Sequence, residues 1–559
     1  MHHGAAVASS QLSLLPESML YQRRQPESST LYKLVYEHLE PFLQYARDNY
    51  RAPLPSYVEK EFRGLLRCGL LRHGFVRVVC RGCKHEYLVA FSCGGRAFCP
   101  SCSARRMVAA GAHIADHVLP RVAIRQWVLT VPWELRMLLM RNKQAFSAVM
   151  RVFGRAVCEV YTSQARNQGV HNPKTGGIVF PQRFGGSLNA HPHVHDLFAD
   201  GVFTVQAFDD VKFVQAQPPS REQIAQVAQR TRDGVLRWLS RSGMLTAPRE
   251  SDEAKPLDAC LQAAISRGSF LRLGQQGEPV ASINRDDARF NHRDASPWSA
   301  SVDGFTVHAG VSIGRANAEA RERLIRYCAR PALSLERLDV LPGGFITYRS
   351  KYPLSGGRTH RVMQPMELMA RLAALVPPPR FALIRYLGVF SPASPLRGLV
   401  VPSEPVERSC AHQRKSATEQ AGTNDQHARA NSAPVRTDAS TEQDPSLAFA
   451  AEQLEQAQPP SLRKRKSYID WATLMQRGLN LDVLACPKCE QRMTVVSAIT
   501  QADVANKILA HLNIPTHPEQ LSDRLPDAVD VTGQSVAQLE QMLAQQCSRG
   551  PPEHHAHHA

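Results

Sequence analysis

The stretch LNAHPHVHDLFADGVF, residues 188–203, decides the fold, because three histidines alternate with other residues and an apolar run follows directly. Side chains two positions apart in a β-strand stand side by side on one face. The alternation and the apolar flanks predict a strand on which His193 and His195 share a face. Two neutral imidazoles in this arrangement can bind one metal ion. The alternative is chance, because the chain has 22 histidines.

The surrounding sequence places this strand in a hairpin. Residues 176–184, GGIVFPQRF, have the composition of a partner strand, and Gly185 and Gly186 follow them. We therefore expect the histidines on the second strand of the hairpin. Downstream, residues 219–265 have helical periodicity, residues 301–313 have the composition of strands, and RANAEARERLIRYCAR forms a helix that ends at Pro331.

Residues 80–102, CRGCKHEYLVAFSCGGRAFCPSC, hold two C-x2-C pairs separated by fifteen residues: Cys80 with Cys83, and Cys99 with Cys102. This spacing is typical of a four-cysteine zinc ribbon, in which each tight turn presents two thiolates to one structural ion. We interpret Cys68 and Cys93 as buried small apolar residues, although either can replace a ligand. Another use of these thiols is the alternative to zinc.

Three arginines are candidates for binding DNA. Arg105 and Arg106 directly follow the ribbon, where they can contact phosphates; the alternative is a solvated basic turn. Arg183 precedes the histidine strand, and an ordinary surface arginine is the alternative there. The whole chain has 67 Lys and Arg against 50 Asp and Glu, a net charge of +17. This balance favours a polyanionic partner, nucleic acid before a membrane surface.

The 559 residues are enough for several domains, and the composition indicates where these end. The segment from 401 to 464 is polar and cannot bury enough apolar area to offset the entropy of ordering, so we expect a disordered linker. In order, we expect a flexible N-terminus, a helical and zinc-ribbon DNA-binding domain, a main domain, this linker, a small C-terminal domain and a tail: residues 1–30, 31–115, 116–400, 401–464, 465–512 and 513–559.

The small C-terminal domain contains CPKC, in which Cys486 and Cys489 form half of a zinc site. The candidates for completing it are Cys547, His511 and His517. The 13 cysteines favour metal ligands over disulfides in a reducing cytosol. The chain has no apolar run of 18 residues and no signal peptide pattern, so we expect no membrane partner and a cytoplasmic, nucleoid-associated protein.

The order of several segments along the chain is specific: PSYVEKEFRGLLRCGLLRHGF, FCPSCSARRM, RQWVLTVPWELR, QRFGGSLN, HPHVHDLFADGVF, LIRYCARPALS, MELMARLAALVPPPR, LGVFSPASPLRGLVVP and CPKCEQRM. Together they resemble the transposases of the insertion sequence 91 and insertion-sequence-common-region families. The resemblance covers about residues 30–400 and 465–512 and leaves out the linker and the last tail.

The resemblance implies an α+β fold, the antiparallel sheet with packed helices of the HUH endonucleases, with the HUH motif on a central strand. Carried over to this chain, His193, Val194 and His195 are that motif. The nucleophile of the family lies in a segment similar to RYCARP, where this chain has Tyr327. Some members have a second tyrosine four residues earlier; Arg323 stands there, so the chain resembles the single-tyrosine members.

Some details of the site stay open at this stage. His191 and Leu387 depart from the family pattern, which more often has asparagine and histidine at these places. The third metal ligand is not evident from the sequence, and the candidates are His191, His308 and His360. For Tyr327 the alternative is a ring packed in the core, because tyrosines at helical spacing are often core residues. The rival nucleophiles are Tyr348, Tyr352 and Tyr386.

The resemblance implies a DNA transposase, and the residues suggest how it would act. With Mg²⁺ or Mn²⁺ held by His193, His195 and a third ligand to neutralise the scissile phosphate, Tyr327 attacks in line and forms a 5′-phosphotyrosine link. The partners would be single-stranded DNA at element ends and target DNA. With one nucleophilic tyrosine per chain, the two element ends could be cut by a homodimer or in successive rounds of cleavage by one chain.

Three other functions compete with this prediction. One is a zinc-ribbon DNA-binding protein without catalysis, and another is an HxH metallohydrolase, which leaves the ribbon and the charge unexplained. A replication initiator or relaxase would use the same HUH site, but the ribbon and the downstream segments resemble the transposases instead.

Overall fold

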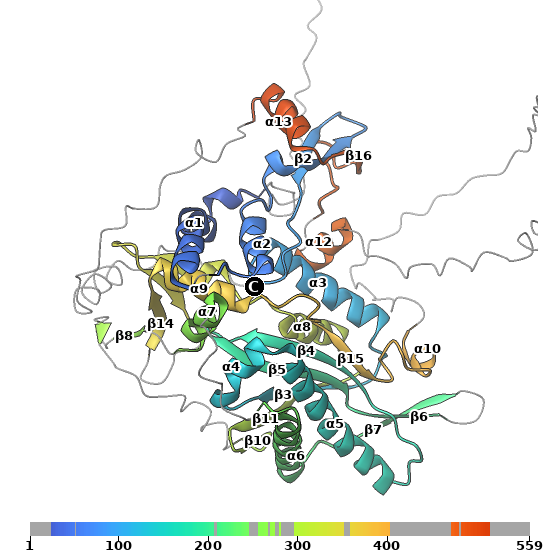
Figure 1. Cartoon of the computed structure of the whole chain (residues 1–559). Helices are drawn as coiled ribbons and strands as arrows, with labels where there is room; N and C mark the ends of the chain where they lie inside the picture. Colours follow the sequence, from blue (N-terminus) through green and yellow to red (C-terminus); the bar gives the residue numbers. More distant parts are fainter. Residues whose placement is uncertain are drawn as a thin grey trace, which may run out of the picture. The chain divides into compact units, whose positions relative to one another are not determined.

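The computed structural model describes residues 24–50, 52–205, 210–244, 255–266, 269–273, 279–280, 296–350, 358–402, 471–479 and 482–514. Helices and strands are mixed along these ranges, and every strand pairing is antiparallel, as expected (Figure 1). The expected linker and nearly all of the expected N-terminal segment and tail lie outside the described residues, so the expectations for these parts stay predictions.

The histidine strand lies inside a six-stranded antiparallel sheet. The strand order is β10 (Ser299–Val302), β11 (Phe305–Ile313), β3 (Ile124–Thr130), β5 (Ala190–Ala199), β4 (Gly176–Phe184) and β15 (Arg385–Gly388). β5 carries the histidines and pairs with β3 on one side and β4 on the other. The expected hairpin is therefore present as β4 and β5. Every residue of β5 is buried, so both of its faces are covered.

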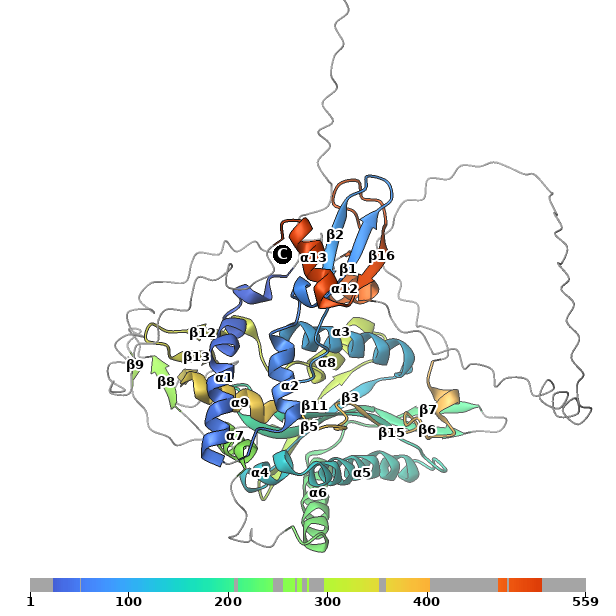
Figure 2. The same cartoon turned by 45° about the horizontal axis from the view of Figure 1, so that its top comes forward.

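Helices cover the two faces of this sheet (Figures 1 and 2). On one face, α5 (Lys143–Asn167) and α6 (Arg221–Arg241) pack against side chains such as Trp127 and Val194. On the other, α3 (Pro100–His117) and α8 (Ala318–Cys328) pack against side chains such as Leu197. Because neighbouring strand residues point to opposite faces, the odd-numbered histidines of β5 face the α3 and α8 side.

Local sequence explains where α8 begins. The side chain of Asn317 accepts a hydrogen bond from the backbone N–H of Ala320 at 2.9 Å, which satisfies one of the free donors at the helix start. Leu324 and Ile325 are buried under the helix, whereas Arg323 is exposed. This amphipathic pattern fixes α8 on the sheet with one face toward solvent.

A second core lies beside the central sheet. It is shared by four helices, α1 (Thr30–Tyr50), α2 (Ser56–Leu65), α7 (Pro256–Ile265) and α9 (Pro365–Leu375). A five-stranded antiparallel sheet adjoins them, in the order β12 (Leu338–Val340), β13 (Ile346–Arg349), β14 (Arg358–Met363), β8 (Ser269–Leu273) and β9 (Pro279–Val280). Phe62, Phe98 and Tyr348 are among the side chains buried in this core.

An N-terminal hairpin and a strand from the C-terminal segment form a three-stranded sheet. Its order is β16 (Met493–Ile499), β1 (Phe75–Cys80) and β2 (Glu86–Ala90), so the C-terminal strand pairs with the edge of the N-terminal hairpin. α13 (Ala502–His511) packs Leu509 against Phe75 beside this sheet. We expected a separate small domain at residues 465–512; instead, this segment completes the ribbon, because its strand and core residues lie against β1.

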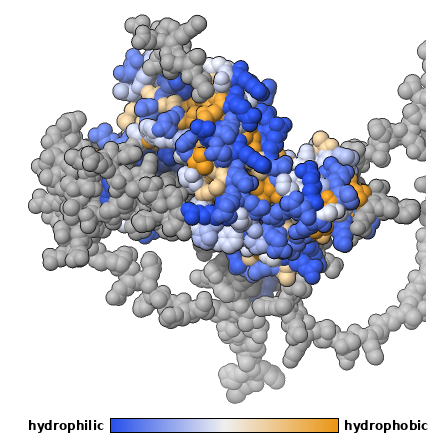
Figure 3. All heavy atoms as spheres, turned by 90° about the horizontal axis from the view of Figure 1, so that it is seen from below, coloured by the Kyte–Doolittle hydropathy of each residue, from blue (hydrophilic) through white to orange (hydrophobic). Residues whose placement is uncertain are grey.

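The remaining elements are short or peripheral: the helices α4 (Trp133–Arg141), α10 (Arg397–Val400) and α12 (Trp471–Leu479), the 3₁₀ turns η2 (Pro26–Ser28), η3 (Leu71–His73) and η6 (Leu335–Arg337), and the strands β6 (Gly201–Val205) and β7 (Val211–Gln215). Among the described residues, no helix is long and apolar enough to span a membrane. The face seen in Figure 3 is largely hydrophilic, with hydrophobic residues in small groups between the hydrophilic ones.

Candidate functional site

Strand β5 brings three imidazoles together on the face covered by α8. The ring centroids of His191 and His193 are 5.2 Å apart, and those of His193 and His195 are 5.0 Å apart. All three side chains are buried. The sequence prediction that His193 and His195 share one face of a strand is confirmed by this arrangement.

Hydrogen bonds at the Nδ1 atoms orient the imidazoles. His193 donates from Nδ1 to the backbone carbonyl of His191 at 2.8 Å, which leaves the lone pair of the neutral ring on Nε2. The Nδ1 atom of His195 lies 2.8 Å from the amide nitrogen, Nε2, of Gln126. Nε2 of His195 is buried and has no hydrogen-bond partner among the described residues. Burial, with smaller effects of His193 and Arg330, holds the pKa of His195 well below its usual value, so its ring is neutral and able to bind a metal ion.

Tyr327 lies over this face from the end of α8. Its ring centroid is 5.8 Å from that of His195, and the two rings are perpendicular, at 89°. The tyrosine is 40% exposed, while Leu324 and Cys328 of the same helix are buried. The ring is therefore not a core residue, and it combines contact with the histidines and access to solvent.

Two glutamines that the sequence analysis did not single out join α8 to the histidine face. Gln182 of β4 lies directly opposite His193 and donates from Nε2 to the backbone carbonyl of Cys328 at 2.7 Å. Because a carbonyl can only accept, this bond fixes the amide, and Oε1 of Gln182 is left buried without a hydrogen-bond partner in the described part of the chain. Gln126 of β3 contacts both His195 and the Cys328 thiol.

The signal for Gln182 was available in the sequence pattern. In the expected hairpin, alternate residues of one strand share a face, so either Gln182 or its neighbour Arg183 must face the histidines. The register of the two strands decides which of them does, and the register cannot be read from this one sequence. The buried Oε1 atom makes Gln182 a better candidate for the third metal ligand than the histidines proposed from sequence.

The three histidines considered as third ligand lie in different surroundings. Nε2 of His191 is 3.4 Å from a guanidinium nitrogen of Arg136, and burial holds the pKa of His191 well below its usual value. His308 lies on β11, with β3 between it and β5. His360 lies on β14, in the other sheet. Among the described residues, no three histidine or carboxylate ligand atoms at the β5 face lie within 4.8 Å of one another, so the three imidazoles alone do not form a three-ligand metal site.

Arg330 supplies a cation at the same place. Its guanidinium carbon lies 5.1 Å from the centroid of the Tyr327 ring and 5.8 Å from that of Phe184. Nε of Arg330 is buried and has no hydrogen-bond partner among the residues that the structure describes. A guanidinium there can stabilise negative charge on the phenol oxygen or on a phosphate beside it.

The rival tyrosines lie elsewhere. Tyr348, on β13, is fully buried, and its hydroxyl accepts a hydrogen bond from the backbone N–H of Ser334 at 3.2 Å. Tyr386, on β15, is partly buried, and burial raises its pKa. Tyr352 lies outside the described residues. Of the described tyrosines proposed from sequence, only Tyr327 has a ring contact with the histidines of β5.

A first cysteine cluster consists of Cys68, Cys93, Cys99 and Cys102. The sulfur of Cys102 is 3.8 Å from that of Cys68 and 3.4 Å from that of Cys93. Four sulfurs bound tetrahedrally to zinc at about 2.3 Å would lie about 3.8 Å apart, so the spacing fits one zinc ion. Cys68, Cys99 and Cys102 belong to the core around Phe62 and Phe98, which makes this cluster part of the main hydrophobic interior.

A second cluster joins the N-terminal hairpin to the C-terminal segment and consists of Cys80, Cys83, Cys486 and Cys489. Sulfur distances are 3.4 Å between Cys80 and Cys489 and 3.5 Å between Cys83 and Cys486. The backbone N–H of Cys83, helped by Cys489, lowers the pKa of the Cys80 thiol to about 6, which favours the thiolate that zinc binds.

These clusters correct the expected ligand set. The pairs Cys80–Cys83 and Cys99–Cys102 do not share one site, because β1 and β2 separate them and each pair meets two other cysteines. Cys68 and Cys93, interpreted as apolar spares, are members of the first cluster. Cys486 and Cys489 are completed by the ribbon; His511 belongs to neither cluster, and His517 and Cys547 lie outside the described residues.

The three arginines proposed to bind DNA differ in their surroundings. Arg105 is exposed on α3, as DNA binding requires. Arg106 instead donates to the backbone carbonyls of Gly95 and Arg96 and so ties down the loop of the first cluster. Arg183 is 6% exposed and donates to the carbonyl of Met140 at 2.9 Å. The expected DNA contact at Arg183 is not supported, because strand alternation turns this side chain away from the His193 face.

Two family models match the chain. The model described as "Transposase zinc-binding domain", of the insertion sequence 91 type, matches residues 37–131, and the model described as "Putative transposase" matches residues 176–396. The first match includes all of the first cysteine cluster, and the second includes the β4–β5 hairpin and α8. The chain belongs to the insertion sequence 91 family of transposases. No curated protein and no solved structure matches it.

Membership in this transposase family implies DNA as the substrate and DNA cleavage with strand transfer as the general activity. The zinc-binding match, together with the two four-cysteine clusters, supports structural zinc in this transposase. The prediction of a transposase with metal-binding cysteines is thereby confirmed.

Proposed function

We propose that this transposase is an HUH-type single-strand DNA endonuclease and strand transferase that uses Tyr327 as its nucleophile. The observation that carries the proposal is the contact between the Tyr327 and His195 rings beside an unpartnered His195 Nε2. A nucleophile and a metal-binding group must lie this close for both to act on one phosphate.

The donor set on β4 and β5 fits a small divalent cation. His193, His195 and the amide oxygen of Gln182 would hold Mg²⁺ or Mn²⁺, which prefer oxygen ligands and accept imidazole. In the structure the Gln126 amide nitrogen lies 2.8 Å from Nδ1 of His195; metal binding by His195 requires the amide to be turned over, so that its oxygen accepts from Nδ1–H and Nε2 keeps its lone pair. When bound, the cation would withdraw charge from the scissile phosphate.

The chain's own residues would carry out the covalent step. The Tyr327 oxygen attacks phosphorus, the phenol proton leaves to solvent, and the bond from phosphorus to the 3′ oxygen breaks. The 3′ oxygen takes up a proton, and the 5′ strand stays attached as a phosphotyrosine. Arg330 would stabilise the phenolate and the charge on the phosphate.

The second step is the reverse reaction with a different strand. The phosphotyrosine link conserves the free energy of the phosphodiester, so a 3′-hydroxyl of target DNA can attack it and release Tyr327 without ATP. Rolling-circle transposition is the process that this sequence of steps would serve. Arg105, exposed on α3, would contribute to binding the DNA backbone.

Incubation of the purified full-length protein with single-stranded DNA from an element end and Mg²⁺ or Mn²⁺ tests the proposal. A denaturing gel should show a protein–DNA adduct that depends on the metal and is absent from Tyr327→Phe. Tyr386→Phe is the matched control and should keep the adduct, because its ring contacts Arg397 instead of the histidines. An adduct that survives Tyr327→Phe would refute the assignment of the nucleophile, and binding of DNA without any adduct would favour a protein that binds DNA without cutting it.

A further inference from the structure

The C-terminal segment after the expected linker reaches toward the tyrosine helix as well as the ribbon. Its first helix, α12, lies beside α3 and α8 (Figures 1 and 2). The segment continues through the second cysteine cluster into β16, which pairs with β1 from Phe75 to Cys80. One short stretch of chain therefore touches the ribbon and the helix that carries Tyr327.

Arg477 of α12 makes the contact with the tyrosine helix. Its guanidinium forms an ion pair with both carboxylate oxygens of Asp116 on α3 and donates to Glu322 of α8 at 2.9 Å. Arg326 of α8 completes the network, since it pairs with Glu322 at 2.5 Å and donates to the backbone carbonyl of Arg477 at 3.3 Å. Asp116 and Glu322 are buried, so the charge of Arg477 offsets two carboxylates that have little access to water.

The network lies within two turns of the proposed nucleophile. Glu322 and Arg326 precede Tyr327 by five residues and one residue on α8. At the C-terminal end of α8, the hydrogen bonds of Gln126 and Gln182 to Cys328 hold the helix to the sheet. The helix is thus held from the sheet below and from α12 above.

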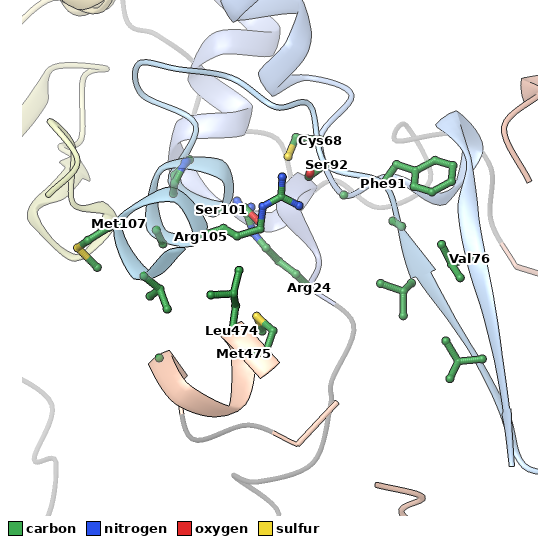
Figure 4. A pocket seen from close by; sticks show the side chains of 18 of the residues that line it. Arg24, Cys68, Val76, Phe91, Ser92, Ser101, Arg105, Met107, Leu474 and Met475 are labelled. Atoms are coloured by element: carbon green, nitrogen blue, oxygen red, sulfur yellow. The ribbon is translucent and has the colours of Figure 1, made fainter. Parts of the chain in front are cut away.

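A hollow lies beside α12. It has a volume of about 680 Å³ and lies between α12, α3 and the ribbon strands (Figure 4). In this view Leu474 and Met475 of α12 lie at the edge of the hollow, opposite Val76 and Phe91 of the ribbon. α12 packs closely on α3, where a Cβ added to Gly478 would overlap the side chain of Val108. Neither His193, His195 nor Tyr327 lines the hollow.

We propose that the C-terminal segment is a brace for the tyrosine helix. The second cysteine cluster is its zinc-dependent anchor on the ribbon, and Arg477 is the positioning residue that transmits the anchor to α8. The inference rests on the proposed function, because it assigns the brace to the helix of the proposed nucleophile. Without the brace, α8 keeps its bonds to the sheet but loses one of the two arginines, Arg477 and Arg326, that pair with Glu322.

The test compares full-length variants. Arg477→Ala removes the brace contact, and Arg477→Lys keeps the charge without the guanidinium fork. Cys486→Ala/Cys489→Ala removes the anchor. Arg492→Ala is the matched control, since Arg492 lies in the same segment and forms an exposed ion pair with Asp482 at 2.8 Å. Zinc content, adduct formation rate at saturating single-stranded DNA, KM for that DNA and hydrogen exchange of residues 318–328 are measured for each.

Arg477→Ala should retain the wild-type zinc content, exchange amide hydrogens of α8 faster and lower the rate at saturating DNA by roughly ten- to a hundredfold with little change in KM. Arg477→Lys should recover part of the rate, and Arg492→Ala should match the wild type. The double cysteine variant should lose one zinc ion per chain and show the same defect in α8. Adding Arg477→Ala to it should cause little further loss, because both substitutions act on one brace.

Unchanged α8 exchange and unchanged rate in Arg477→Ala would overturn the brace. A rise in KM alone in the cysteine variant would also overturn it and would assign the segment to DNA binding. If the wild type forms no adduct at all, the proposed function fails, but zinc content and α8 exchange still decide whether the brace exists.

Discussion

The two faces of strand β5 have the same backbone and opposite roles. On the α8 side, His191, His193 and His195 present imidazoles, and His195 Nε2 lies there without a hydrogen-bond partner among the described residues. On the α5 side, Val194 and Phe198 are packed in a large hydrophobic core. The three imidazoles belong to no hydrophobic core cluster, whereas Val194 and Phe198 are apolar core residues without groups for acid–base or metal chemistry. Substitutions on the two faces should therefore separate activity from stability.

The largest expected effect is on the histidine face. His193→Ala/His195→Ala should lower the rate of adduct formation by roughly a thousandfold or more, because the metal-binding pair would contribute several kcal/mol of transition-state stabilisation. The melting temperature should fall only slightly, since the loss of the two Nδ1 hydrogen bonds is partly offset by removal of a buried nitrogen without a partner in the described part of the chain. Gel quantification and thermal unfolding check the two halves. A large loss of stability together with activity would show that the histidines serve the fold.

The second-largest effect on adduct formation should come from Arg330, at the edge of the histidine face. Arg330→Ala should reduce the rate of adduct formation by about a hundredfold, because a cation over the Tyr327 ring is lost from a partly buried site. Arg330→Lys should recover part of the rate. Arg323→Ala is the control, because Arg323 forms only an exposed ion pair with Glu319 on the same helix, and this variant should behave like the wild type. Equal effects of the two alanine variants would indicate general electrostatic binding of DNA.

On the opposite face, Val194→Ala should lower the free energy of unfolding by about 2 kcal/mol, through lost apolar contact and a small cavity. The remaining folded protein should cut DNA at the wild-type rate, although Val194 lies between the two proposed metal ligands in sequence. Denaturant unfolding measured beside the adduct assay gives both quantities. A rate that falls at temperatures where the protein is folded would show that the two faces are coupled.

The smallest effect should come from Gln182, which is a candidate metal ligand and also holds the end of α8 through its hydrogen bond to Cys328. Gln182→Ala should weaken Mn²⁺ binding by about tenfold, as expected for a ligand or partner beside the two imidazoles. Calorimetric titration of Mn²⁺ into the zinc-loaded protein measures the change. Wild-type Mn²⁺ affinity in this variant would remove Gln182 from the metal site and leave it the role of holding Cys328.

Sequence reasoning succeeded for β5 because the signal was local. The spacing of His193 and His195 predicts a shared strand face whatever the rest of the chain does. The contact of Tyr327 with His195 required the family resemblance, since the two residues are far apart along the chain and no local pattern links them. The exposure of Tyr327 also could not be read from its helical spacing, which fits a core residue equally well.

Two other parts were beyond the sequence for a physical reason. The cysteine pairs were grouped by distance along the chain, whereas the fold groups them by strand pairing: Cys80 and Cys489 meet across 409 residues. Gln182 and Arg183 are neighbours with similar polarity, and only the register of β4 against β5 decides which one faces the histidines. Non-local pairing and register depend on the whole chain.

The meeting of β1 and β16 has a consequence for synthesis on the ribosome. At about 5–20 residues per second, the 409 residues between Cys80 and Cys489 take about 20–80 s to emerge. During that time the ribbon hairpin has an unpaired edge, and Cys80 and Cys83 lack half of their cluster. A chain that stops early never closes this sheet. β16 is the last of the described strands to be made, so nascent or truncated chains that lack it should be the substrates that proteases and chaperones recognise first.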